Sequence, residues 1–182
     1  DLVRLAARAG VGGGALGGDR DWNWQSAEVE LRPVFPDGGV LSLQAAGLAV
    51  GGRPPAQEAA YLGGDANLRG YDRLEFAGAQ RVTLRAEYAL GIDLLARTGI
   101  PWVRSFHLQF IPFADAGSTW GATRAVAGTA PALEGDVRSS IGLGLKRDLW
   151  FPGAEAVRLD IIHRNDGRGD PWSFWFRFVS IQ

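Results

Sequence analysis

Apolar and polar side chains alternate along much of the chain. In the segment 82–88 every second side chain is apolar, and the side chains between them are polar or charged. Successive side chains of a strand point to opposite faces, so this pattern predicts a β-strand with one apolar and one polar face. The same alternation recurs along the sequence in residues 3–11, 26–32, 40–50, 82–88, 106–110, 138–146, 157–161 and 173–178, and one strand is expected at each of these stretches. The sequence therefore predicts an all-β, antiparallel fold of eight strands.

The apolar faces of such strands can meet either a protein core or lipid, so a soluble β-sandwich is an alternative at this point. Two features favour a transmembrane β-barrel. Each strand segment is expected to span about 9 to 13 residues, as a tilted strand needs to cross the hydrocarbon, whereas sandwich strands centre near 5 to 6. Connections also alternate between short turns and long loops, as in outer-membrane barrels, although the connection 91–104 departs from this rule. The short turns are 36–39 and 150–153, and the long loops are 51–79, 118–136 and 163–171.

Aromatic residues near the expected strand ends point the same way. Amphipathic rings favour the headgroup level of a membrane, so we expect these residues to form a girdle there. The alternative is that the rings make ordinary capping contacts under loops. The residues concerned are Trp22, Trp24, Tyr88, Trp102, Trp120, Trp150 and Trp172.

Composition narrows the functional classes. Glycine accounts for 26 of 182 residues, and a hydrophobic content of 46% is too mixed for a helical membrane protein. The absence of cysteine excludes disulfides, thiolate metal sites and a cysteine nucleophile, and a net charge of −1 argues against a nucleic-acid partner. His107 and His163 lie far apart without a second ligand at metal spacing, and no nucleophile, base and orienting group converge. We therefore expect no catalytic residue, no metal and no cofactor.

Two short motifs carry the most specific information. The first lies in the long loop 51–79 and consists of Leu68, Arg69, Gly70 and Tyr71. The second follows in a later strand, where Phe113, Asp115 and Gly117 alternate with alanines.

The charges in and near these motifs complement one another. The alternation places Glu87 and Asp115 on the inward faces of neighbouring strands, where carboxylates need a cation. Arg69 offers a planar fork for bidentate hydrogen bonding, and Gly70 removes a side chain where backbones must approach closely. The alternative is that Arg69 is a solvated loop charge and that Asp115 only starts a turn. We expect Arg69 to bind Asp115 and Glu87 and so to hold the loop 51–79 inside the lumen.

The ordered set of loop tip, Glu-bearing strand, Asp-bearing strand and the glycine-rich segment 139–145 resembles a known family. It is similar, over about residues 51–164, to the bacterial surface-antigen barrel of outer-membrane assembly factors of the BamA, TamA and two-partner-secretion transporter type. In that family a loop with an Arg-Gly-Phe/Tyr tip folds into the lumen, and a following strand carries a Phe-x-Asp-x-Gly element. The resemblance implies a sixteen-stranded barrel, of which residues 1–182 would be a single transmembrane domain supplying the C-terminal eight strands.

The resemblance also implies a function. It places the protein in the bacterial outer membrane, where it would insert or translocate polypeptides without covalent chemistry and would not be an enzyme. Implied partners are outer-membrane lipid, unfolded or secreted polypeptides, and accessory lipoproteins or periplasmic domains of the same gene product. The alternative is a small structural or adhesive outer-membrane barrel with no transport role.

The last strand resembles the aromatic C-terminal signal by which such barrels are recognised for assembly. Phe174, Phe176 and Phe178 carry the resemblance, and their spacing places them on one face, which we expect to meet lipid. Residues 179–182 follow, whereas most family members end on the aromatic residue itself.

Overall fold

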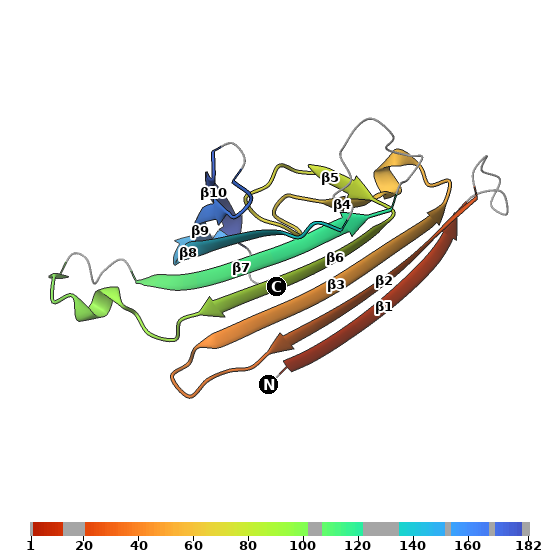
Figure 1. The fold of residues 1–182 in the computed structure, drawn as a ribbon. Coiled ribbons are helices and arrows are strands. Elements are labelled where there is room, and N and C mark those ends of the chain that lie inside the picture. The colour runs from red at the N-terminus through yellow and green to blue at the C-terminus, as the bar shows by residue number, and fades with distance from the viewer. Residues whose placement is uncertain are drawn as a thin grey trace.

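The computed structural model describes residues 2–12, 21–101, 107–121, 135–151, 154–167 and 170–179. These residues form one eight-stranded antiparallel sheet in which the strands follow one another in chain order (Figure 1). The strands are β1 (Leu2–Gly12), β2 (Trp22–Arg32), β3 (Val40–Gly52), β6 (Gln80–Ala89), β7 (Leu108–Trp120), β8 (Arg138–Phe151), β9 (Ala154–Arg164) and β10 (Trp172–Val179). The predicted all-β, antiparallel fold of eight strands is confirmed.

The strands extend beyond the stretches that alternate in the sequence, and for two of them the reason is visible. β2 begins at Trp22 rather than at Ser26, because Asn23 and Gln25 interrupt the apolar alternation without interrupting the ladder. β7 extends to Trp120 and so includes the Phe113–Gly117 motif, which follows a proline that obscures the pattern. Phe106, the expected start of this strand, lies outside the described residues.

The connection between β3 and β6 carries structure of its own. It contains a short 3₁₀ helix, η2 (Ala56–Glu58), and a small antiparallel hairpin of β4 (Ala60–Leu62) and β5 (Phe76–Gly78). At the opposite end of the sheet, the connection between β6 and β7 is long and contains η3 (Leu95–Arg97). The connection 91–104 therefore does depart from the alternation of short turns and long loops. No described helix has the length and apolar character needed to cross a membrane.

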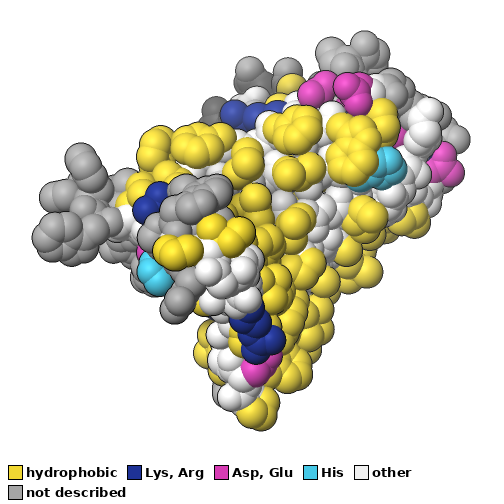
Figure 2. Space-filling model, turned by 90° about the vertical axis from the view of Figure 1, so that its left-hand side faces the viewer, with side chains coloured by type: hydrophobic (Ala, Val, Ile, Leu, Met, Phe, Trp, Pro, Cys, Tyr) yellow, Lys and Arg dark blue, Asp and Glu magenta, His cyan; other side chains and the backbone are white. Residues whose placement is uncertain are grey.

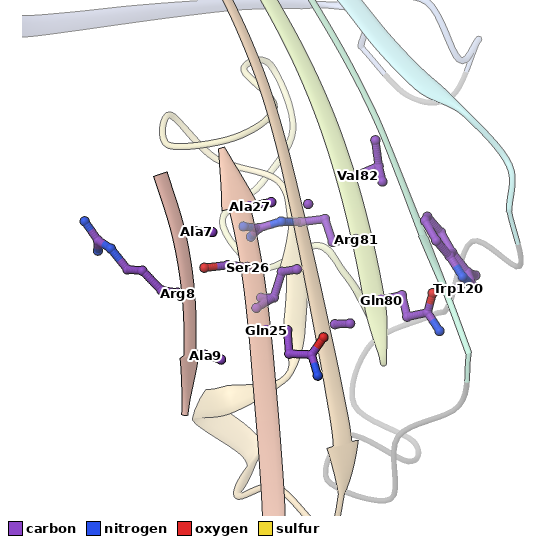
Figure 3. Close-up of a pocket in the computed structure, with 13 residues that line it drawn as sticks. Ala7, Arg8, Ala9, Gln25, Ser26, Ala27, Gln80, Arg81, Val82 and Trp120 are labelled. Atoms are coloured by element: carbon purple, nitrogen blue, oxygen red, sulfur yellow. The ribbon is translucent and has the colours of Figure 1, made fainter. Parts of the chain in front are cut away.

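The hairpin of β4 and β5 contacts one face of the sheet, which we call the inner face (Figure 1). The cross-strand register places the charged residues of the alternating pattern on this face, including Arg8, Glu87 and Asp115. In a close-up of β1, Arg8 and its apolar neighbours Ala7 and Ala9 project to opposite sides of the strand (Figure 3).

The other, outer face is apolar and exposed. Leu5 and Val11 on β1 are 72% and 73% exposed. The three phenylalanines of β10 share this face and are 67%, 64% and 67% exposed in chain order. In the space-filling view, apolar side chains extend over much of the visible surface and charged side chains form small groups (Figure 2). Contiguous apolar surface of this kind is rare on a protein that meets only water, and it suits lipid.

The sheet is open, and β1 and β10 form its two edges. The described residues therefore do not close into a barrel by themselves, and the sixteen-stranded barrel, of which residues 1–182 would supply half, stays a prediction. Edge strands carry unpaired backbone donors and acceptors, which cannot face hydrocarbon. The two edges accordingly need further strands, or each other, in a membrane.

The expected aromatic girdle is only partly correct. The register places Tyr88, Trp120 and Trp172 on the outer face near strand ends, as a girdle requires. Trp22 and Trp24 instead lie on the inner face, where their indoles cover two glycines of β1. Their position near a strand end does not determine which face they occupy. The face depends on whether a residue is at an odd or an even position along the strand. Trp102 and the side chain of Trp150 lie outside the described residues.

Candidate functional site

The loop between β3 and β6 brings a small apolar cluster of its own to the inner face of the sheet. Leu62, Leu68, Tyr71 and Phe76 are all buried and pack together. Gly117 on β7 makes room for this cluster, since a side-chain carbon at that position would lie 2.7 Å from Cδ1 of Leu62. The cluster explains why this loop folds onto the sheet and does not extend into solvent.

Arg69 lies at the centre of the docked loop and is completely buried. Its Nε and Nη2 atoms donate to the two carboxylate oxygens of Asp115, each at 2.6 Å, and its backbone N–H donates to the same carboxylate at 3.2 Å. Nη1 donates to Glu87 on β6. The guanidinium carbon also lies 3.7 Å from the ring centre of Phe113, which is a cation–π contact. The loop tip is thus joined to β6 and β7 by one side chain.

The charge of Arg69 is stabilised where it lies. Burial by itself lowers the pKa of this guanidinium, but hydrogen bonds and charge from Asp115 and Glu87 outweigh burial and raise the pKa above its ordinary value. A bidentate pair with a fully buried carboxylate is among the strongest side-chain contacts in proteins. The pair therefore fixes the position of the loop tip.

The two residues after Arg69 complete the docking. Gly70 adopts a φ of +86°, and a side-chain carbon there would lie 2.8 Å from Cγ2 of Ile162 on β9. The hydroxyl of Tyr71 donates to the backbone carbonyl of Ser139 on β8 at 3.0 Å. Burial raises the pKa of Tyr71 to about 12. Together the four motif residues 68–71 contact the wall from β6 to β9.

The family model of the Omp85 superfamily domain matches residues 16–151, which is more than half of the chain. The chain belongs to the Omp85 superfamily. This superfamily is characteristic of the outer membrane of bacteria and related organelles, and its members assemble or translocate polypeptides and are not enzymes. No curated protein matches the chain significantly.

The ion pairs around Arg69 continue to the last two strands of this Omp85 sheet through residues that were not expected from the sequence. Arg158 on β9 donates to Glu87 at 3.0 Å and to Asp160 at 2.6 Å. Asp160 is fully buried and accepts a further hydrogen bond from Arg177 on β10 at 2.8 Å. Positive and negative side chains therefore alternate along a network that joins β6 and β7 to β9 and β10 on the inner face.

Sequence reasoning missed Arg158, Asp160 and Arg177 as members of the site. Strand parity does place all three on the polar face, so a weak signal was present. Which polar residues meet depends on the offset between neighbouring strands, and alternation within one strand says nothing about that offset.

Two glycines of β8 make space for this network. A side-chain carbon at Gly142 would overlap the ring of Phe113, the residue on which Arg69 stacks. One at Gly144 would lie 2.7 Å from the Oδ1 atom of Asp160 and 2.8 Å from the Nε atom of Arg158. The glycine-rich character of β8 thus has a local packing reason.

The outer face of the Omp85 sheet contains a hollow of about 620 Å³ that is floored mainly by small side chains (Figure 3). The side chain of Ser26, which borders this hollow through its backbone, belongs to the inner face, and the described lining includes no histidine or carboxylate that could serve as a catalytic base. Phe174, Phe176 and Phe178 lie on this outer face, apart from the buried network of the inner face.

Proposed function

We propose that this chain is the C-terminal part of a bacterial outer-membrane Omp85 barrel that inserts or translocates polypeptides, with the loop 51–79 held in the lumen by Arg69. The observation that carries the proposal is the bidentate pair between Arg69 and Asp115, which fastens a loop to the inner face of a sheet whose outer face is apolar. The proposed partners are outer-membrane lipid on the outer face and unfolded or secreted polypeptides on the inner side. Accessory lipoproteins or periplasmic domains of the same gene product complete the proposed assembly.

The loop and the wall of strands are held by different kinds of contact. The strand ladder is made of backbone hydrogen bonds, whereas the loop is attached through side chains such as Arg69, Tyr71 and the apolar cluster. A loop attached in this way can be loosened or displaced without unpairing the strands. This property suits a channel or insertase that must admit a polypeptide.

Replacing Arg69 by Ala tests the proposal. The change leaves Asp115 and Glu87 without their shared cation, and removing one partner of a buried pair costs about 3 to 5 kcal/mol, or less where the lumen is hydrated. We expect loss of function with retention of the fold. The assay uses the full-length protein in liposomes and measures the rate at which it promotes insertion of an unfolded model barrel or translocation of an unfolded polypeptide. Heat-modifiable migration in gels and the β-sheet circular dichroism signal report whether the wall is intact.

Arg97→Ala is the matched control. Arg97 is exposed and lies in η3 at the opposite end of the sheet, so its loss removes the same charge without touching the loop. Full activity of Arg69→Ala would refute a role for the anchored loop. A wild-type protein that neither promotes insertion nor translocates would instead indicate a structural barrel.

A further inference from the structure

An ion pair joins the loop to the last strand of the sheet. Nη1 of Arg177 on β10 donates to both carboxylate oxygens of Asp65, at 2.6 Å and 2.8 Å. Asp65 precedes the loop tip, and its side chain is 52% exposed. The other terminal nitrogen of Arg177 is held by Asp160, which is fully buried. A buried carboxylate therefore orients Arg177 toward the loop.

β10 is one of the two edge strands, so contacts from outside the strand ladder matter to it. Among the described residues it pairs with β9 along one side, and its other side is an edge of the sheet. Its outer face carries three exposed phenylalanines, so within the described chain the contacts that can hold it come from β9 and from the inner face. The ion pair with Asp65 is such an inner-face contact and comes from outside the sheet.

The ion pairs of the inner face form a sequence that starts and ends on the loop. Arg69 binds Glu87, Glu87 binds Arg158, Arg158 binds Asp160, Asp160 binds Arg177, and Arg177 binds Asp65. Each of the three arginines in this sequence lies between two carboxylates. Movement of the loop away from the sheet would withdraw both Arg69 and Asp65 and leave Arg177 with one carboxylate fewer.

We propose that the loop latches the last strand: while the loop is docked, Asp65 holds Arg177 and thereby restrains β10 against the sheet, and undocking of the loop releases β10. This inference goes beyond the proposed function, because it concerns which strand the loop controls and does not depend on any substrate. It assigns Asp65 and Arg177 as positioning residues for the edge strand.

A crosslinking experiment tests the contact itself. The chain contains no cysteine, so Asp65→Cys combined with Arg177→Cys in the full-length protein, cleared of any other cysteine, provides a unique pair. A short bifunctional thiol reagent should join the two positions in detergent and in liposomes. Tryptic peptides analysed by mass spectrometry identify the product. Ala66→Cys with Arg85→Cys is the reference pair, because Arg85 donates to the carbonyl of Ala66 and so reports a docked loop on β6.

The crosslinking results of the two cysteine pairs together decide whether the latch exists. Linkage of both pairs supports the latch. Linkage of 66 to 85 without linkage of 65 to 177 refutes the latch while the loop is docked, and failure of both pairs refutes it because the loop is then not docked at all.

Hydrogen exchange tests the consequence for β10. Asp65→Asn removes the charge of the latch and leaves the side-chain size almost unchanged. Because the pair is partly exposed, its loss should accelerate amide exchange in β10 by only about twofold to fivefold, with β6 and β7 unaffected. Asp72→Asn on the same loop is the matched control, since Asp72 is exposed and contacts Glu75 through its backbone.

A double-mutant comparison separates the latch from the pair between Arg177 and Asp160. Arg177→Gln should also accelerate exchange in β10, and Asp65→Asn should add little to it if the two residues act as one unit. Full additivity of the two changes, or unchanged exchange in Asp65→Asn, would overturn the proposal. Neither measurement involves transport, so the latch and the proposed function can fail independently.

Discussion

Replacing Gly70 by Ala is predicted to loosen the docked loop while leaving the sheet intact. Gly70 adopts a φ of +86°, which costs an L-residue about 1 to 2 kcal/mol. The added carbon would also lie 2.8 Å from Cγ2 of Ile162 and 3.2 Å from Cγ of Arg164, and overpacking of this kind typically costs about 1 to 3 kcal/mol. The two contributions together amount to about 2 to 5 kcal/mol against docking.

Trypsin can measure this loss directly. Arg69 is completely buried and can be cleaved only when the loop leaves the sheet, so the cleavage rate follows the population of undocked loop. A cost of about 2 to 5 kcal/mol raises that population roughly 30-fold to a few thousandfold. Initial rates of cleavage after Arg69 are read by mass spectrometry, with cleavage after the exposed Arg73 as an internal reference.

Two further variants test the reasoning. Ile162→Ala in the Gly70→Ala background removes the overlapping methyl group and should recover the steric part of the loss, leaving the conformational part. Gly99→Ala imposes a positive φ of similar size, +72°, where a side-chain carbon meets nothing within 4 Å, and it should leave cleavage after Arg69 unchanged. Unchanged cleavage in Gly70→Ala, or no recovery with Ile162→Ala, would show that the docked geometry is not the one described.

Two other predictions concern the outer face and the loop. Phe176→Asp should reduce barrel insertion, because an acid on the lipid face costs on the order of 2 kcal/mol near the midplane. The control is Ser26→Asp, which places an acid on the inner face opposite Arg8 and should insert normally. Equal yields of heat-modifiable protein from the two variants would reject the lipid-facing assignment of Phe176. The raised pKa of Tyr71 means that its contribution to docking is fully present below pH 10 and is lost as the pH rises through about 12. The difference in phenolate absorbance between the wild type and Tyr71→Phe should therefore titrate near pH 12, and a midpoint near pH 10 would contradict burial of this hydroxyl.

Strand parity explains how much of this site the sequence could predict. Parity within β6 and β7 placed Glu87 and Asp115 on the same face, and the only cation in the loop motif was Arg69, so the contact could be anticipated. The partners contributed by β9 and β10 could not, because the pairing of Arg158 with Glu87 depends on the stagger of three strand pairs between them. Each stagger is fixed by packing across the sheet, to which glycines such as Gly144 contribute, and packing leaves no trace in the alternation of one strand.

Strand alternation could not show which strands lie at the open edges of the sheet, for a different reason. Alternation predicts that a strand has two faces, but a strand at an edge and a strand in the middle of a sheet show the same alternation. β1 and β10 alternate as regularly as β6, yet each has one unpaired side in the structure.

The ion pair between Asp65 and Arg177 joins residues 112 positions apart, and this separation sets an order of events during synthesis and assembly. A chain that emerges from its N-terminus presents the loop long before it presents the last strand, so the loop waits with Asp65 unpaired while β6, β7, β8 and β9 are added. Contacts between such distant residues are slow to form, because the intervening chain must first be ordered. Final docking of the loop is therefore a late step that reports arrival of the last strand, and a chain arrested before residue 172 would present a sheet with its loop still incompletely fastened.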